Sequence, residues 1–369
     1  MDILLDLEIL FGLAILTVLL VRRLALPSII GFLAAGMIAG PHALALVKSA
    51  HQVEQMAEIG VVLLLFTIGI EFSLKELMRI RQMVFLGGGL QSALTAAATA
   101  AIACAVGYPL NQAIFFGFLI ALSSTAIIMK LLIDAGEMDT PHGKTTLGIL
   151  IFQDLCVVPL MLITPLLAGN NQEASDILLI MLKAVTVVLV AHYGARYIIP
   201  WVLQQVVSAR SRELFILTVI FIGFGTAWLT AAAGLSLALG AFIAGLAISE
   251  SEYSQQVLGD IIPFRDAFMS LFFLSVGMLL DPAVLLKDPL LVVGIVTSII
   301  LIKFLMSAIA VRAIGLPLRI AIFSGLALAQ IGEFSFVLSQ SGLKQGLMSA
   351  DVYQLFLAAS IATMALTPF

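Results

Sequence analysis

The feature of this sequence that most limits its fold is a succession of apolar runs of about 20 residues, separated by short polar or Gly/Pro-containing segments. Of the 369 residues, 62% are hydrophobic and only 11% are charged, whereas a soluble domain carries roughly 25% charged residues. So few charges cannot cover a water-facing surface, and most of the surface must face lipid. The sequence therefore predicts an all-α, polytopic membrane protein embedded in a bilayer.

Thirteen membrane-spanning helices are predicted from these runs. They cover about 3–22, 26–45, 54–73, 84–107, 111–133, 145–168, 175–200, 212–233, 235–250, 262–281, 289–314, 319–341 and 350–369. The Lys and Arg residues that flank them lie mostly on one side of the membrane, and only Lys48, Lys287 and Lys344 fall on the other. Because basic flanks stay cytoplasmic, we expect the N-terminus outside and the C-terminus in the cytoplasm.

Local similarities within the chain recur at nearly one offset. GFLIALSSTAI from 117 matches GLALAQIGEFS from 325, and LLFTIGIE from 64 matches FFLSVGMLLD from 272, both at an offset of 208. GFLAAG from 31 matches GAFIAG from 240 at an offset of 209. The offset relates spans that are seven apart, so the two copies run through the membrane in opposite directions.

We therefore predict a single transmembrane transporter domain over 1–369, with an inverted repeat. The first copy covers about 3–168 and holds spans one to six, and the second covers about 212–369 and holds spans eight to thirteen. A linker helix at about 175–200 joins them. Inverted repeats are typical of secondary transporters, whose substrate site lies near the midplane where the repeats meet.

Polar clusters interrupt the fifth and twelfth spans at aligned positions. The fifth span carries Ser123, Ser124 and Thr125, and the twelfth carries Gln330, Gly332, Glu333 and Ser335. A lone Ser or Thr commonly bonds to the carbonyl one turn earlier in an unbroken helix. Because the clusters occur in both copies, we favour unwound segments that expose backbone groups and half-helix dipoles to an ion.

Asp154 lies near the centre of the sixth span, in ILIFQDLCVVPL. A charge at the bilayer centre costs at least ~2.5–3.5 kcal/mol on insertion scales, so intramembrane ionisable residues are functional candidates. Pro159 cannot donate to the carbonyl of Leu155, which loosens the helix just after the carboxyl. A carboxyl in this setting binds either a proton or a metal ion, and that competition is the minimal chemistry of an antiporter. A permanent ion pair with Lys303 is the structural alternative, which we favour less because apolar packing often replaces such pairs.

Two other ionisable residues lie at mid-membrane depth. Lys303, in the eleventh span, either pairs with Asp154 until a cation binds or acts as a static support for a broken helix, and both roles stay open. Glu333 either coordinates the ion or neutralises the N-terminus of a half-helix. We favour the second role for Glu333.

Five segments together carry a resemblance to a known family: EIGVVLLLFTIGIEF, ALSSTAI, FQDLCVVPL, LFFLSVGM and QIGEFSFVLS, in that order. From about Pro27 to its C-terminus the chain resembles the Kef-type branch of the monovalent cation:proton antiporter-2 family. The resemblance implies a homodimer with a dimerisation half and a core half. It also implies that the fifth and twelfth spans cross at unwound segments, and it implies a multi-pass location in the bacterial inner (cell) membrane.

The resemblance further implies an ion site built around Asp154 with Gln153 beside it, and Lys303 as the basic partner. We predict that the transported cation and proton bind at Asp154, Gln153, Ser123, Ser124 and Thr125, with Lys303, Glu333 and Gln330 in support. No cofactor is expected, since the cargo is K⁺ or Na⁺ and H⁺. A single titratable carboxyl releases one proton for one cation, which indicates electroneutral 1:1 exchange. The resemblance favours K⁺ over Na⁺.

The chain departs from the glutathione-gated members of that branch in one loop. The segment SEYSQQVLGDIIPFRDAF (251–268) keeps SEY and PF but lacks the His and most of the acidic residues of their regulatory motif. No Gly-rich dinucleotide fingerprint occurs in the 369 residues. A cytoplasmic nucleotide-binding regulatory domain, if one belongs to this protein, is therefore expected beyond residue 369.

Other classes of protein fit the sequence less well. A gated potassium efflux channel is the main alternative, but the inverted repeat, the midplane carboxyl and the lack of a TVGYG-like filter favour an antiporter. A mere membrane anchor would not need mid-membrane charges. An enzyme is not predicted, because no Ser/His/Asp or HExxH arrangement occurs. A net charge of −4 without a basic tail argues against a nucleic-acid partner.

Overall fold

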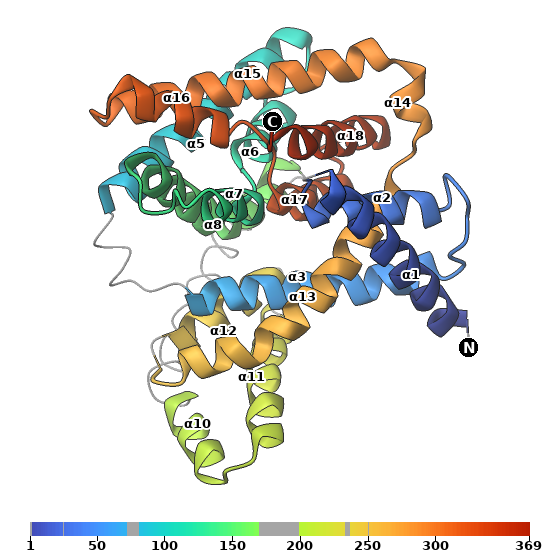
Figure 1. Cartoon of the computed structure of the whole chain (residues 1–369), viewed down its shortest axis with the longest axis vertical. Helices are drawn as coiled ribbons and strands as arrows, with labels where there is room; N and C mark the ends of the chain where they lie inside the picture. The colour runs from blue at the N-terminus through green and yellow to red at the C-terminus, as the bar shows by residue number, and fades with distance from the viewer. Residues whose placement is uncertain (1, 25, 72–80, 170–198, 233–236, 250) are drawn as a thin grey trace. The chain divides into compact units, whose positions relative to one another are not determined.

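A computed structural model describes residues 2–24, 26–71, 81–169, 199–232, 237–249 and 251–369. Helices and short connections make up this part of the chain, and it contains no strand. The chain forms two compact units. The first consists of Met1–Ala50, Met78–Gly169 and Leu274–Phe369, and the second of His51–Leu77 and Asn170–Phe273. Figure 1 labels the helices of both units.

The first unit holds most of the described helices. They are α1 (Asp2–Arg23), α2 (Ser28–Ala39), the π-helix η1 (Gln82–Gly88), α5 (Gly89–Val106), α6 (Leu110–Ala121), α7 (Thr125–Asp134), α8 (Pro141–Leu167), α14 (Ala283–Lys287), α15 (Pro289–Ala313), α16 (Leu318–Ala327), α17 (Glu333–Lys344) and α18 (Ala350–Leu366). The second unit holds α3 (Ala50–Glu71), α10 (Ile199–Ser208), α11 (Arg212–Ala232), α12 (Leu237–Ser249) and most of α13 (Ser254–Leu279), whose last residues belong to the first unit.

Every predicted span except the seventh has a helix at its place. The seventh span, at about 175–200, falls almost wholly outside the described residues. Within the described ranges, 8 helical stretches are long and apolar enough to cross a membrane. The short helices α10 and α14 were not predicted. The helix predicted from residue 262 begins at Ser254, since Pro263 lies inside α13 and does not start it.

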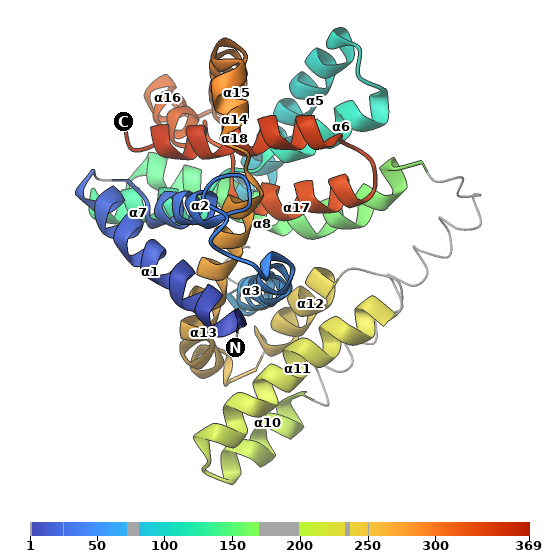
Figure 2. The same cartoon turned by 90° about the vertical axis from the view of Figure 1, so that its right-hand side faces the viewer.

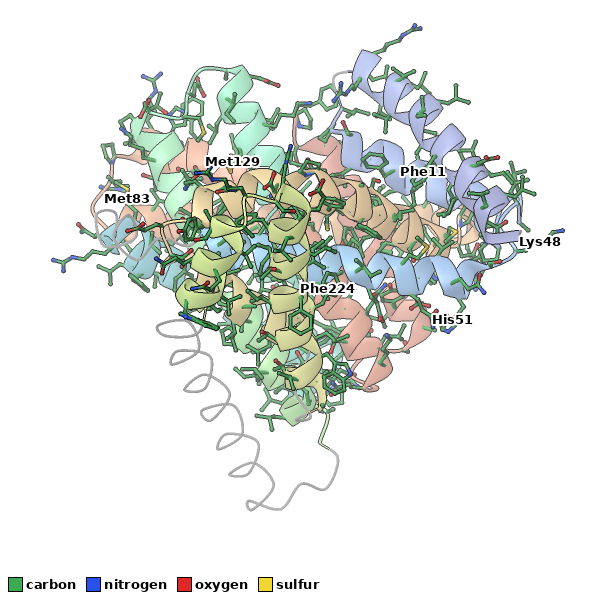
Figure 3. The ribbon with its side chains drawn as sticks, turned by 90° about the horizontal axis from the view of Figure 1, so that it is seen from below. Phe11, Lys48, His51, Met83, Met129 and Phe224 are labelled. Carbon is green, nitrogen blue, oxygen red and sulfur yellow. The ribbon has the colours of Figure 1, made fainter. Side chains whose placement is uncertain are left out.

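The outer faces of several helices carry large apolar side chains that the protein covers only in part. Phe11 of α1, labelled in Figure 3, is 41% exposed. Phe221 of α11 and Leu290 of α15 are 77% and 86% exposed. Water-facing surfaces rarely expose large contiguous apolar patches. These faces are suited to lipid, and the chain is a multi-pass membrane protein.

In the first unit, α2 crosses α13 at the distance of direct backbone contact. A Cβ atom on Gly36 of α2 would overlap the carbonyl oxygen of Leu274, and one on Gly277 of α13 would overlap that of Leu33. Each helix therefore contributes a glycine that receives the backbone of the other. Small residues allow such close helix crossings in membranes.

The second unit contains a matching crossing of α3 and α12. A Cβ atom on Gly69 of α3 would overlap the carbonyl oxygen of Phe242, and one on Gly245 of α12 would overlap that of Phe66. Each of these four residues lies 208 or 209 positions from its counterpart in the crossing of α2 and α13. The internal repeat predicts this correspondence, because equivalent pairs of glycines should make equivalent contacts. Each unit is thus built from segments of both sequence copies.

Candidate functional site

The predicted fifth span is broken in the middle. Helix α6 ends at Ala121 and α7 begins at Thr125. Between them Leu122 (φ −79°, ψ 138°) and Ser124 (φ −79°, ψ 109°) adopt extended backbone conformations. The hydroxyl of Ser124 accepts from the backbone N–H of Ile127 at 3.3 Å and so caps α7. A hydroxyl in this place satisfies one of the backbone N–H groups that a helix start leaves without a partner, and it stabilises the start by about 1 kcal/mol relative to alanine.

The predicted twelfth span is broken at the aligned position. Helix α16 ends at Ala327 and α17 begins at Glu333, after Gly332 in an extended conformation (φ −94°, ψ 168°). Both interruptions that the polar clusters predicted are therefore confirmed.

The two breaks touch each other through their backbones. The N–H of Gly332 donates to the carbonyl of Leu122 at 3.1 Å. The hydroxyl of Ser123 donates to the carbonyl of Leu328 at 3.0 Å. A Cβ atom on Gly332 would lie 2.5 Å from the carbonyl oxygen of Ser123, so this close crossing requires glycine. Unwound segments satisfy their backbone groups within the protein, as a bilayer demands.

An apolar core holds the half-helices in place. It combines residues of α7, α8, α15 and α16 with one residue of the second break, namely Ile128, Leu132, Ile149, Leu150, Val311, Ala321 and Leu328. Helix α17 packs along α8, as Figure 2 shows. The breaks are thus fixed on both sides by regular helices.

Lys303 of α15 neutralises the C-terminal end of α6. Its side chain is fully buried, and its Nζ donates to the carbonyls of Ile120 at 2.6 Å and Leu122 at 3.0 Å. The last carbonyls of a helix lack intrahelical donors and carry the negative end of its dipole. Of the two roles left open for Lys303, these contacts favour the static support of a broken helix.

Glu333 lies where two half-helices begin. It is the first residue of α17, and its Oε1 accepts from the backbone N–H of Ala126 in the first turn of α7 at 3.4 Å. Its side chain is buried. A carboxylate is favourable at the positive end of a helix dipole, and this contact matches the structural role that we favoured. Beside it, Nε2 of Gln330 reaches the carbonyl of Ser124 at 3.5 Å.

Asp154 of α8 lies beside the break between α6 and α7. Its carboxylate oxygens accept from Oγ1 of Thr125, at 3.0 Å for Oδ1 and 2.9 Å for Oδ2. Thr125 is the first residue of α7, and both side chains are only half-buried. The structure thus places the titratable carboxyl that we singled out against the start of an interrupted helix.

The side-chain amide of Gln153 is held by hydrogen bonds to other residues of the protein. Its Oε1 accepts from the backbone N–H of Ser123 at 2.6 Å, and its Nε2 donates to Oε1 of Gln91 at 2.7 Å. Both ends of the amide therefore bind the protein. Gln91, on α5, was not predicted from the sequence as a residue of this site. The only available signal was an amide within an apolar span, and a lone amide there is usually a packing residue.

The oxygen atoms near the crossing are those of carboxyl groups, hydroxyls and backbone carbonyls, which are hard donors suited to hard cations. Within the described residues, no group of three or more His, Cys, Asp or Glu side chains could hold a resident metal ion. The arrangement is instead one in which the half-buried carboxyl of Asp154 can exchange a proton for a weakly held cation.

Two broken helices that cross beside a half-buried carboxyl, with a lysine and a glutamate at the half-helix ends, define a class of membrane protein, the secondary transporters. The chain belongs to the family described as sodium/hydrogen exchanger, transmembrane, which matches residues 10–369.

Two relatives support the Kef-type resemblance. The chain is 37% identical over 350 residues to K(+) efflux antiporter 1, chloroplastic, of Arabidopsis thaliana, covering 92% of this chain and 29% of the relative. It is 34% identical over 359 residues to the glutathione-regulated potassium-efflux system protein KefC of Escherichia coli O6:K15:H31, covering 97% of this chain and 58% of the relative. The chain therefore spans less than two thirds of the length of these relatives.

A solved structure supports the fold. The sodium proton antiporter MjNhaP1 from Methanocaldococcus jannaschii, at pH 8, superposes with a TM-score of 0.69 at 15% identity, covering 100% of this chain and 96% of that one. At this level of identity the likeness concerns the fold alone.

Proposed function

We propose that this chain is the membrane part of an antiporter that exchanges a monovalent cation for a proton at Asp154. The observation that carries the proposal is the contact of the Asp154 carboxylate with Thr125 at 2.9 and 3.0 Å, where an interrupted helix begins. A half-buried carboxyl at a helix break can bind a proton or a partly dehydrated cation, and it cannot bind both. Mutual exclusion at one group couples the two fluxes.

The cargo is K⁺, exchanged one for one with H⁺. The names of the relatives support K⁺ over Na⁺, because they describe K(+) efflux and potassium-efflux proteins. Gln153, bonded to Ser123 and Gln91, adds no second titratable group next to Asp154. One proton then leaves for each cation that enters, and the exchange is electroneutral.

The proposal also includes the oligomeric state of the protein, its membrane and its orientation in that membrane. It works as a homodimer in the bacterial inner membrane, with the N-terminus outside and the C-terminus in the cytoplasm. The asymmetry of Lys and Arg flanks supports this orientation. A cytoplasmic regulatory domain is a further part of the proposal, since the relatives are longer than this chain.

Purified protein in liposomes with an internal pH dye tests the proposal. We expect a K⁺ gradient to move protons, with Rb⁺ close to K⁺ and with Na⁺ and Li⁺ weaker. An imposed membrane potential of about 100 mV should leave the initial rate unchanged, although one net charge moved across it would gain about 2.3 kcal/mol. Transport driven by voltage alone contradicts electroneutral exchange. Cation currents without proton movement would identify the alternative, a gated potassium efflux channel.

A further inference from the structure

A chain of buried amides connects α5 to the break between α6 and α7. Gln91 and Gln153 are both completely buried. Nε2 of Gln153 donates to Oε1 of Gln91 at 2.7 Å, and Oε1 of Gln153 accepts from the N–H of Ser123 at 2.6 Å. The chain starts one turn further along α5, where Oγ1 of Thr95 accepts from Nε2 of Gln91 at 3.1 Å.

The direction of this chain is set by the chemistry of its members. A primary amide presents an oxygen that only accepts and a nitrogen that only donates. The backbone N–H of Ser123 can only donate, so Gln153 must turn its oxygen to Ser123 and its nitrogen to Gln91. Gln91 must then turn its oxygen to Gln153 and its nitrogen to Thr95, whose hydroxyl can accept. If Gln153 rotated by half a turn, its NH₂ group would face the N–H of Ser123, and two donors would be opposed.

Local sequence brings Gln91 to this position. The π-helix η1 packs on α8, and a Cβ atom on Gly88 would overlap the ring of Phe152. Gly88 and Gln91 are three residues apart and lie on the same face of the helix, and Phe152 directly precedes Gln153. The missing side chain at Gly88 therefore lets the two helices approach until the amides meet. Single π-helical turns frequently occur at functional sites.

We propose that Gln91 is a positioning residue for cation binding, acting through Gln153 on the unwound segment that contains Ser123. This inference rests on the proposed exchange at Asp154. When the N–H of Ser123 is held by Gln153, the segment between α6 and α7 keeps the geometry that puts Thr125 on the carboxylate. The amide of Gln153 is thereby kept bonded to the protein and does not swing to the carboxylate or the ion.

Replacing Gln91 by Met removes the acceptor while keeping the size of the side chain. Gln153 then has a buried donor without a partner, which costs about 1–3 kcal/mol, and the break loosens. We expect the K⁺ concentration for half-maximal exchange to rise about tenfold in the liposome assay, with the maximal rate changed less than about twofold. Thr95→Val, which removes only the outer partner of Gln91, should give a smaller rise in the same direction.

Two comparisons separate positioning from general packing. Thr99→Val is the matched control, because the hydroxyl of Thr99 lies on the same helix and has no hydrogen-bond partner among the described residues. It should behave like the unaltered protein. In a double-mutant cycle, the Gln91→Met/Gln153→Met protein should be no worse than Gln153→Met alone, because Gln91 acts through Gln153. Additive effects, or an unchanged half-maximal concentration in Gln91→Met, overturn the inference.

Hydrogen exchange of the backbone tests, independently of transport, whether Gln91 positions the segment that contains Ser123. Peptides that contain Ser123 should exchange faster in Gln91→Met than in Thr99→Val, because the bond from Ser123 to Gln153 is weakened. Equal exchange in the two variants contradicts the inference. If the unaltered protein moves no protons on addition of cation, the proposed function is wrong, and the exchange rates still show whether Gln91 positions the break.

Discussion

Replacing Asp154 by Asn should abolish cation-dependent proton movement. The asparagine keeps the size of the side chain, and its oxygen can still accept from Oγ1 of Thr125, as the carboxylate does at 2.9–3.0 Å. It cannot release a proton and carries no charge to hold a cation. Both halves of the proposed exchange depend on that one group, so we expect the rate in liposomes to fall by at least about 100-fold. The protein should remain folded, with an unfolding temperature in detergent close to that of the unaltered chain.

Asp134→Asn provides the matched control. Asp134 ends α7 and is exposed, so the same chemical change there removes a carboxylate that lies outside the crossing. This variant should exchange at the normal rate. Asp154→Asn protein that retained more than about a tenth of the exchange rate would show that another group carries the proton.

Replacing Lys303 by Met should destabilise the protein and slow exchange together. The ammonium donates to the carbonyls of Ile120 at 2.6 Å and Leu122 at 3.0 Å. Leu122 keeps the N–H of Gly332 as a donor, but the carbonyl of Ile120 loses the ammonium. A buried polar group that loses its partner costs about 1–3 kcal/mol. We therefore expect a clearly lower unfolding temperature in detergent and an exchange rate reduced about tenfold, because the break in the fifth span is no longer held.

Lys130→Met, which removes an exposed ammonium from α7, is the control and should change neither quantity. A Lys303→Met protein that unfolds at the normal temperature and exchanges at the normal rate would contradict the supporting role.

Much of this architecture was predictable because the bilayer restricts the chain so strongly. Apolar runs located the helices, and the polar clusters at Ser123 and Gly332 located the breaks, since a polar interruption in hydrocarbon is costly unless the protein satisfies it. The depth of Asp154 in its span pointed to this carboxyl as the one that exchanges proton and cation, and that role stays a prediction. These features follow from local sequence alone.

The partners of the polar groups could not be predicted in the same way. Gln153 was expected beside the ion, but its amide is bonded at both ends, to Ser123 and to Gln91. Lys303 was considered as a partner of Asp154, and its contacts are carbonyls of α6. Such pairings depend on which helices are neighbours and how they are rotated, and hydropathy does not encode either. The π-helix that brings Gln91 to α8 has no signature in the apolar pattern.

The dependence of the K⁺ concentration for half-maximal exchange on pH tests the central claim most directly. If a proton and a cation compete for Asp154, that concentration should rise about tenfold for each unit of pH lowered, in the range where the carboxyl is mostly protonated, because each tenfold increase in protons must be matched by a tenfold increase in cation. The maximal rate at saturating K⁺ should stay constant over the same range, provided that the pH is equal on both sides of the membrane. A half-maximal concentration that does not change with pH, accompanied by a falling maximal rate, would contradict competition at a single carboxyl.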